Sequence, residues 1–153
     1  MSPNSPLAGL QPEDRMAIDW IGGNLPPGSD ITVFTPADWQ HDYIGEWLPA
    51  LVDARSVATV QGTEWLGPSE HRAAIHRHVD LQTCLLFGAE CFAQWMTRHA
   101  SIGSYLYAPK TSQRNFAAAD CCSGVRETLE ADPRFRTVYD GPGAQIFAFA
   151  PAP

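Results

Sequence analysis

Apolar positions along the chain follow two patterns, one with the period of a helix and one of short continuous runs. Residues 12–24 repeat apolar side chains at helical spacing, and residues 31–34 form a β-branched and aromatic run typical of a buried strand. The same criteria predict further helices over 43–52, 70–99 and 118–131, and further strands over 56–60, 103–108, 135–139 and 144–149. We expect Gly88 to divide the long helix.

This alternation of strands and helices predicts an α/β fold, a three-layer Rossmann-like sandwich with a mainly parallel sheet. The turn sequence 140–143 joins the last two strands and predicts a C-terminal antiparallel hairpin. No glycine-rich turn follows the first strand, so the chain lacks the dinucleotide-binding motif. We expect residues 1–11 to be a flexible lead-in or linker and residues 12–150 to form a single α/β domain.

Composition narrows the function classes. The 153 residues include 17 acidic and 10 basic side chains, which give a formal net charge of −7. Such a chain repels phosphate backbones, so we expect no nucleic-acid partner.

No run of about 18 apolar residues is present, so no membrane span is expected, and the first ten residues lack the features of a secretory signal. Any export signal would then lie outside this chain. No motif for a cofactor is found.

The four cysteines favour disulfide bonds. Cys84 and Cys91 are seven residues apart on the predicted long helix, about 10.5 Å along its axis. Cys121 and Cys122 are adjacent. This spacing predicts that Cys84 and Cys91 each pair with one of Cys121 and Cys122, in either of two connectivities. Such bonds persist only in an oxidising compartment.

Other uses of the cysteines stay open. The chain has neither the C-x2–4-C spacing of a zinc knuckle nor the C-x-x-C spacing of a redox pair. Buried free thiols are the plain alternative. The histidines do not predict a metal site either, because His71, His76 and His78 lack the i, i+4 spacing of a helical zinc site. A solvated, arginine-rich helical face accounts for them.

Polar and aromatic residues follow the first two predicted strands. If these strands are parallel neighbours, the loops after them meet at one edge of the sheet. Tryptophan faces beside carboxylates and amides suit sugars, and paired carboxylates can also perform acid–base chemistry. The candidate ligand-binding residues are Asp38, Trp39, His41, Asp42, Glu46, Gln61, Glu64 and Trp65. The alternative is structural: Trp47 has the spacing of a core residue, and Glu46 and Glu64 suit helix caps or a solvated surface.

Two stretches, EWLPAL at 46–51 and RSVATVQGTEW at 55–65, resemble a block in bacterial polytopic membrane proteins of the GT-C glycosyltransferase class, which use lipid-linked sugars. Residues 17–28 and 132–147 are similar to the beginning and end of the extracytoplasmic region in which that block occurs. The resemblance implies a C-terminal domain of a membrane-tethered parent protein, periplasmic or at the cell surface. Catalytic residues of that class lie near its first membrane helices, so none is carried over.

We therefore expect a non-catalytic extracytoplasmic accessory domain of a membrane glycosyltransferase-like protein. Its expected partners are the membrane-embedded part of the same protein and an acceptor, carbohydrate or lipid-linked sugar. Two alternatives remain at this point: a free-standing Rossmann-like enzyme acting on a small molecule, and a protein–protein interaction module.

Overall fold

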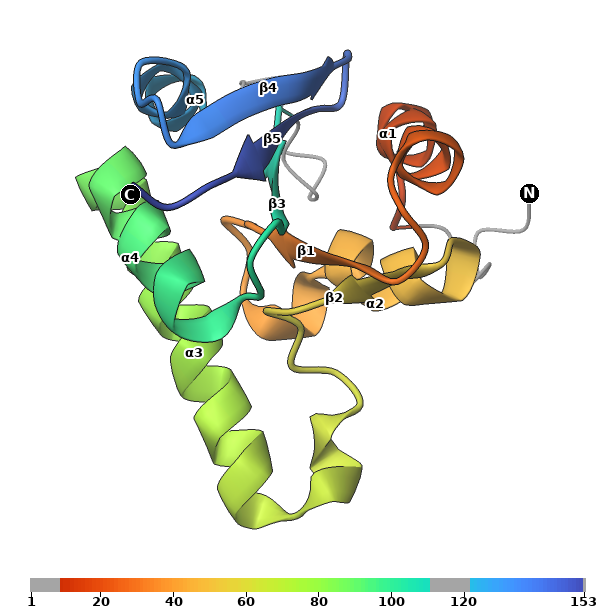
Figure 1. Cartoon of the computed structure of the whole chain (residues 1–153). Coiled ribbons are helices and arrows are strands. Elements are labelled where there is room, and N and C mark those ends of the chain that lie inside the picture. The colour runs from red at the N-terminus through yellow and green to blue at the C-terminus, as the bar shows by residue number, and fades with distance from the viewer. Residues whose placement is uncertain (1–8, 111–121, 153) are drawn as a thin grey trace.

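A computed structural model describes residues 9–110 and 122–152. The chain has an α/β fold built on one five-stranded mixed sheet (Figure 1). The helices are α1 (Pro12–Asn24), α2 (Tyr43–Leu51), α3 (Pro68–Phe87), α4 (Ala89–His99) and α5 (Ser123–Glu130), with short 3-10 helices η1 (Trp39–His41) and η2 (Thr63–Leu66). The strands are β1 (Ser29–Val33), β2 (Ala54–Ser56), β3 (Tyr105–Pro109), β4 (Phe135–Asp140) and β5 (Ala144–Phe149).

The sheet has the strand order β2-β1-β3-β5-β4. β1 pairs in parallel with both β2 and β3, whereas β5 pairs antiparallel with both β3 and β4. The sheet is therefore evenly mixed rather than mainly parallel. The physical reason is that the free edge of β3 is taken by β5, which runs back beside it, and not by a further parallel strand.

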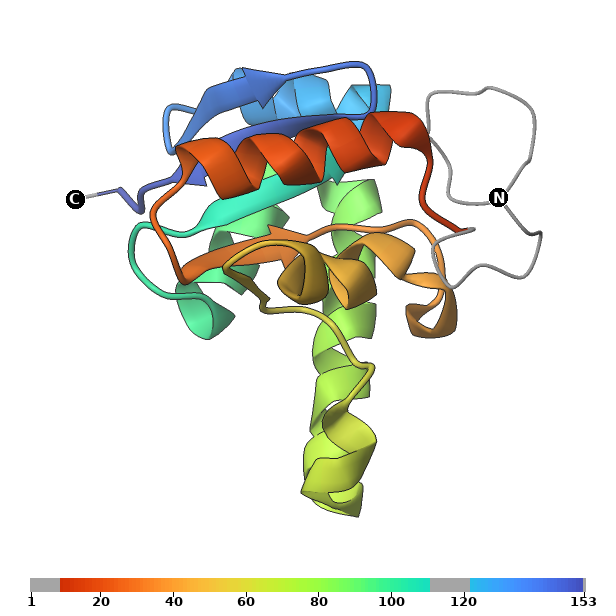
Figure 2. The ribbon, with the colours of Figure 1, turned by 90° about the vertical axis from the view of Figure 1, so that its right-hand side faces the viewer.

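Apolar side chains from the sheet enter a separate core on each face. α1 and α2 cover one face, where Ile31 and Tyr107 are buried, and α3, α4 and α5 cover the other, where Leu106 is buried (Figures 1 and 2). Leu106 and Tyr107 are neighbours in β3 and enter opposite cores because successive side chains of a strand point to opposite faces.

The second strand is shorter and earlier than predicted. β2 ends at Ser56, and its ladder to β1 closes with the hydrogen bond from Val57 N–H to Ile31 C=O, 3.0 Å long. The chain then turns, and the side-chain hydroxyls of Ser56 and Thr59 lie 2.5 Å apart across the turn. Ala58 is buried in the core under α3 and α4, so the apolar run at 56–60 reports burial and not strand structure.

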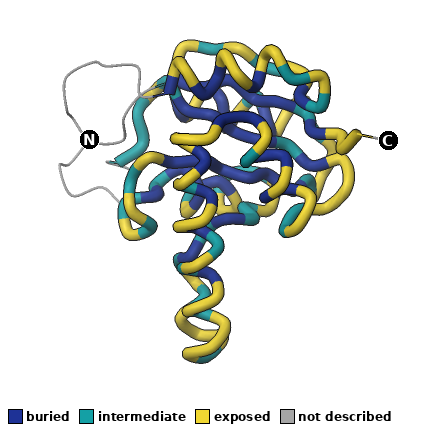
Figure 3. The backbone as a smooth tube through the Cα atoms, turned by 90° about the vertical axis from the view of Figure 1, so that its left-hand side faces the viewer, coloured by how far each residue is buried: buried dark blue, intermediate teal, exposed yellow. Residues whose placement is uncertain are grey.

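The first half of α3 and the preceding η2 form an arm that projects from the body of the molecule (Figures 2 and 3). Most of the arm is exposed, including the η2 side chains Trp65 and Leu66 at 92% and 65%. The other end of α3 packs into the core, with Leu81 and Cys84 buried. The arm is thus held by the body at its base and presents apolar side chains at its tip.

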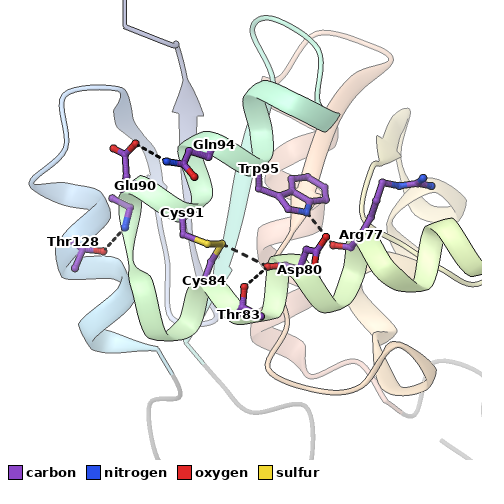
Figure 4. The surroundings of a disulfide bond; sticks show 10 residues. Arg77, Asp80, Thr83, Cys84, Glu90, Cys91, Gln94, Trp95 and Thr128 are labelled. Carbon is purple, nitrogen blue, oxygen red and sulfur yellow. Dashed lines mark hydrogen bonds between the residues drawn. A yellow bond between two sulfur atoms is a disulfide. The ribbon is translucent and has the colours of Figure 1, made fainter.

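The chain breaks the long helix at Gly88, as predicted. Gly88 has a φ of 71°, a conformation that favours glycine, and it separates α3 from α4. The turn brings Cys84 and Cys91 to a Cα–Cα distance of 5.2 Å, and they form a disulfide (Figure 4). The predicted pairing of these two cysteines with Cys121 or Cys122 is therefore wrong, because the predicted spacing assumed a straight helix. No described cysteine is free, and Cys121 lies outside the described residues.

Within the described ranges, no helix combines the length and the apolar character needed to cross a bilayer.

Candidate functional site

The loops that follow β1 and β2 meet beyond the carboxyl ends of these strands. Gln61, after β2, donates a side-chain hydrogen bond from Nε2 to the backbone oxygen of Gln40 in η1, at 3.4 Å. The parallel pairing of β1 and β2 is what places both loops at the same edge of the sheet. We call residues 38–42 and 61–65, together with His71, the rim.

His71 joins the two rim loops, and the sequence did not single it out for this role. The ring of Trp39 meets the ring of His71 edge to face, with centroids 5.6 Å apart. The Nδ1 atom of His71 lies 2.9 Å from the Thr63 hydroxyl, at the start of η2. One side chain on α3 therefore contacts a residue from each loop and holds half-buried Trp39 against the first turn of α3.

Asp38 and His41 form a partly exposed pair on the rim. The Nδ1 atom of His41 lies 2.6 Å from a carboxylate oxygen of Asp38, and the His41 ring contacts Tyr43 edge to face. Both residues lie on the turn of η1, where a spacing of three residues brings the two side chains together. This pair offers a carboxylate and an imidazole to a ligand that arrives from solvent.

Asp42 has a structural role in this arrangement. It is 1% exposed, and its Oδ1 accepts a hydrogen bond from Gly45 N–H at 3.0 Å, which caps α2. Burial raises the pKa of Asp42 to about 7, and the nearby Glu46 raises it further, while hydrogen bonding from Gly45 and Thr59 opposes this rise. A Cβ atom at Gly45 would collide with side-chain oxygens of Asp42 and Thr59. Asp42 therefore stabilises the fold and does not face solvent.

The remaining candidate residues occupy different surroundings. Glu46 is exposed on α2, while Oε2 of Glu64 accepts a hydrogen bond from Gly62 N–H at 2.7 Å. Trp65 is carried on the arm, where it is exposed to solvent. Asp38, Trp39, His41 and Gln61 thus form the compact part of the rim, and Glu64 and Trp65 extend it along the arm.

His78 differs from the solvated residue that the sequence predicted. It is 1% exposed in the core beneath α3, with Nδ1 3.4 Å from the backbone oxygen of Ala58. Burial lowers the pKa of His78 and thus favours the neutral ring. Across residues 9–110 and 122–152, no three His, Cys, Asp or Glu side chains are placed to hold a metal ion.

The chemical groups on the rim are suited to binding a ligand. Asp38 and His41 are paired with each other, and Glu64 accepts a backbone hydrogen bond. Asp42, the carboxyl group whose pKa is raised the most, is buried inside the protein. Trp39 and Trp65 add aromatic surface, which together with carboxylate and amide groups can bind the faces and hydroxyls of a sugar. Comparisons with family models, curated proteins and solved structures gave no match to this chain.

Proposed function

We propose that this chain is a non-catalytic extracytoplasmic accessory domain of a membrane glycosyltransferase-like protein, and that its rim binds a sugar or an acceptor. The observation that carries the proposal is the junction of the two loops, through Gln61 with Gln40 and through Trp39 with His71. At this junction lie the half-buried ring of Trp39 and the partly exposed Asp38–His41 pair, while the side-chain oxygen of Gln61 is buried. The membrane-embedded part of the parent protein is the proposed partner.

Two further features support the compartment and the architecture. The Cys84–Cys91 disulfide is compatible with an oxidising, extracytoplasmic location. Helices on both faces of the sheet support a three-layer Rossmann-like sandwich. In such folds ligands bind beyond the carboxyl ends of parallel strands, which is where the rim lies.

A titration of the protein with mono- and oligosaccharides tests sugar binding, with tryptophan fluorescence as the readout. We expect a saturable change that is lost in Trp39→Phe and kept in Trp20→Phe. Trp20 is the matched control because it lies on α1, with its ring packed against that of Tyr139, on the face of the sheet opposite α3. A flat response for every sugar, or equal loss in both variants, would contradict the proposed role of the rim.

A second candidate function, that of an interaction module, is favoured by the arm. Trp65 and Leu66 present exposed apolar surface on a projecting element, and tryptophan is enriched at the energetic centres of protein interfaces. Trp65→Ala separates the two functions. Loss of protein association with sugar affinity unchanged would favour the interaction module, whereas loss of sugar affinity alone would favour the rim.

A further inference from the structure

A depression lies between the first half of α3 and the end of α4, apart from the residues of the rim. Its volume is about 390 Å³, within the range of small-molecule sites. The residues that line it are Ser69, Arg72, Ala73, His76, Arg77 and His99. Two arginines and two histidines thus face it, and no acidic residue is in its lining. The depression is a basic site in a chain whose formal net charge is −7.

The arginines of this site differ from four other cationic side chains in the described ranges, which form ion pairs. Arg15, Arg55, Lys110 and Arg134 each have a carboxylate partner. Arg72 and Arg77 form no ion pair with any residue in the described ranges. Their guanidinium groups therefore keep their hydrogen-bond donors available, and a guanidinium binds phosphate through two parallel hydrogen bonds.

The wall of the depression is held by buried contacts. The indole N–H of Trp95 donates a 2.9 Å hydrogen bond to the backbone oxygen of Arg77, which ties α4 to α3 (Figure 4). Trp95 is 3% exposed, and its ring lies against that of His99 with centroids 4.8 Å apart. The backbone of Arg77 and the ring of His99 are therefore held in place before any ligand arrives, which lowers the entropic cost of binding.

The surrounding charges favour an anion. Ser69 lies in the first turn of α3, where backbone N–H groups lack helical partners and the helix dipole is positive. Glu70 in the same turn opposes this effect. Burial lowers the pKa of His99, and Arg77 and Arg98 lower it further, against an opposing contribution from Asp80. The positive charges of Arg77 and Arg98 near His99 disfavour the protonated ring and would attract an anionic ligand.

We propose that this depression binds a phosphate ester, with Arg72 and Arg77 as the principal contacts and His76 and His99 beside them. None of the rim residues lines this depression, so phosphate binding here does not depend on sugar binding at the rim. The phosphate can come from a soluble ester or from a lipid headgroup, since the same groups recognise both.

The test follows the indole N–H of Trp95 and the ring of His99 by NMR while ¹⁵N-labelled protein is titrated with glycerol 3-phosphate. Glycerol, which lacks the phosphate group and its charge, is the control ligand. We expect saturable shifts with the phosphate ester only. The Arg72→Gln, Arg77→Gln double variant should weaken the affinity by about tenfold or more, because each guanidinium–phosphate contact is a charge-assisted hydrogen bond. An absence of saturable shifts in the parent protein would overturn the proposal.

The control is Arg136→Gln on β4, where the arginine is exposed. This substitution removes one positive charge, as Arg72→Gln or Arg77→Gln alone does, but it lies outside the depression. Affinity should be unchanged in this variant. Weakening equal to that of Arg72→Gln alone would show a general charge effect and would overturn the site. If the double variant fails to fold, the Arg72→Lys variant is used. Lysine keeps the charge and loses the two-pronged geometry, so reduced affinity is again expected and unchanged affinity counts against the proposal.

Vesicles distinguish the two sources of phosphate. Sedimentation is measured with phosphatidylcholine vesicles and with vesicles that also contain phosphatidic acid. Binding that needs phosphatidic acid and is lost in the arginine double variant supports a lipid headgroup. Binding of glycerol 3-phosphate without vesicle binding supports a soluble ester.

Discussion

The rings of Trp39 and His71 meet edge to face at 5.6 Å, although they belong to elements 32 positions apart in the chain. Trp39 follows β1, while His71 lies near the start of α3 and also contacts Thr63. This contact connects the loop after β1 to the first turn of α3, within the arm. The proposed binding surface therefore depends on a residue of α3 as well as on the two loops.

Replacing His71 with alanine should loosen the rim. The substitution removes one aromatic contact and one hydrogen bond, so we expect a loss of about 1–2 kcal/mol in the free energy of unfolding. Chemical denaturation measures this loss. His76→Ala is the control, because His76 is an exposed histidine of the same helix. Equal losses in the two variants would show that His71 does not connect the loops.

The Asp42→Asn variant should gain stability relative to the parent protein as the pH rises. The folded-state pKa of Asp42 is about 7, above its ordinary value of 3.8, so the folded protein retains a proton that the unfolded chain has lost. This contribution to stability is full below pH 3.8 and is lost as the pH rises toward 7 and beyond. Asparagine keeps the oxygen that accepts from Gly45 N–H and carries no charge.

We therefore expect the stability of Asp42→Asn, relative to the parent protein, to increase between pH 5 and pH 8 by about 1–3 kcal/mol. The comparison with the parent cancels the contributions of Asp14, whose pKa burial raises to about 6, and of His78, whose pKa burial lowers. Urea denaturation at several pH values gives the difference. A relative stability that is constant over this range would contradict the assignment.

Peptide mapping tests the disulfide pairing. Trypsin cuts after Arg77 and Arg98, so residues 78–98 form one peptide that contains both Cys84 and Cys91. Without reductant, this peptide should appear alone and lighter than its reduced form by two hydrogens. A cross-link between it and the peptide that holds Cys121 and Cys122 would contradict the structure and restore the pairing expected from the sequence.

Gly88→Ala should destabilise the protein more than Gly103→Ala does. Both glycines have positive φ, at 71° and 78°, so each substitution strains the backbone by roughly 1 kcal/mol. A Cβ at Gly88 would also lie 3.0 Å from the Thr128 hydroxyl, whereas nothing lies within 4 Å at Gly103. We expect a loss of about 2 kcal/mol or more for Gly88→Ala in thermal or chemical denaturation. Equal losses of stability in the two variants would show that α5 shifts to accommodate the added methyl group and would contradict this prediction.

The local pattern predicted most elements because each depends on neighbouring residues. α2 forms over Tyr43–Leu51, close to prediction, although Gly45 and Pro49 weaken its helical signal. Burial against the sheet and the Asp42 cap outweigh these two residues. The strand predicted over 56–60 was wrong because an apolar segment is equally suited to a strand and to a buried turn.

Features that depend on the angle between elements were not predictable in the same way. Gly88 marked a helix break, but no local pattern specifies how far the chain turns there, and this turn decides that Cys84 pairs with Cys91. The same turn brings His99 beside Arg72 and Arg77. The sequence placed the loops of the rim at one edge, whereas the contribution of His71 required the course of α3 across that edge.

Chemical-shift mapping of a bound sugar on the ¹⁵N-labelled protein is the most direct measurement of the central claim, that the joined loops form the binding surface. A sugar that binds should shift the backbone signals of residues 38–41 and 61–65, the indole N–H of Trp39 and the ring of His71, and leave those of α5 in place. Shifts confined to other parts of the chain, or no shift with any sugar, would contradict the claim.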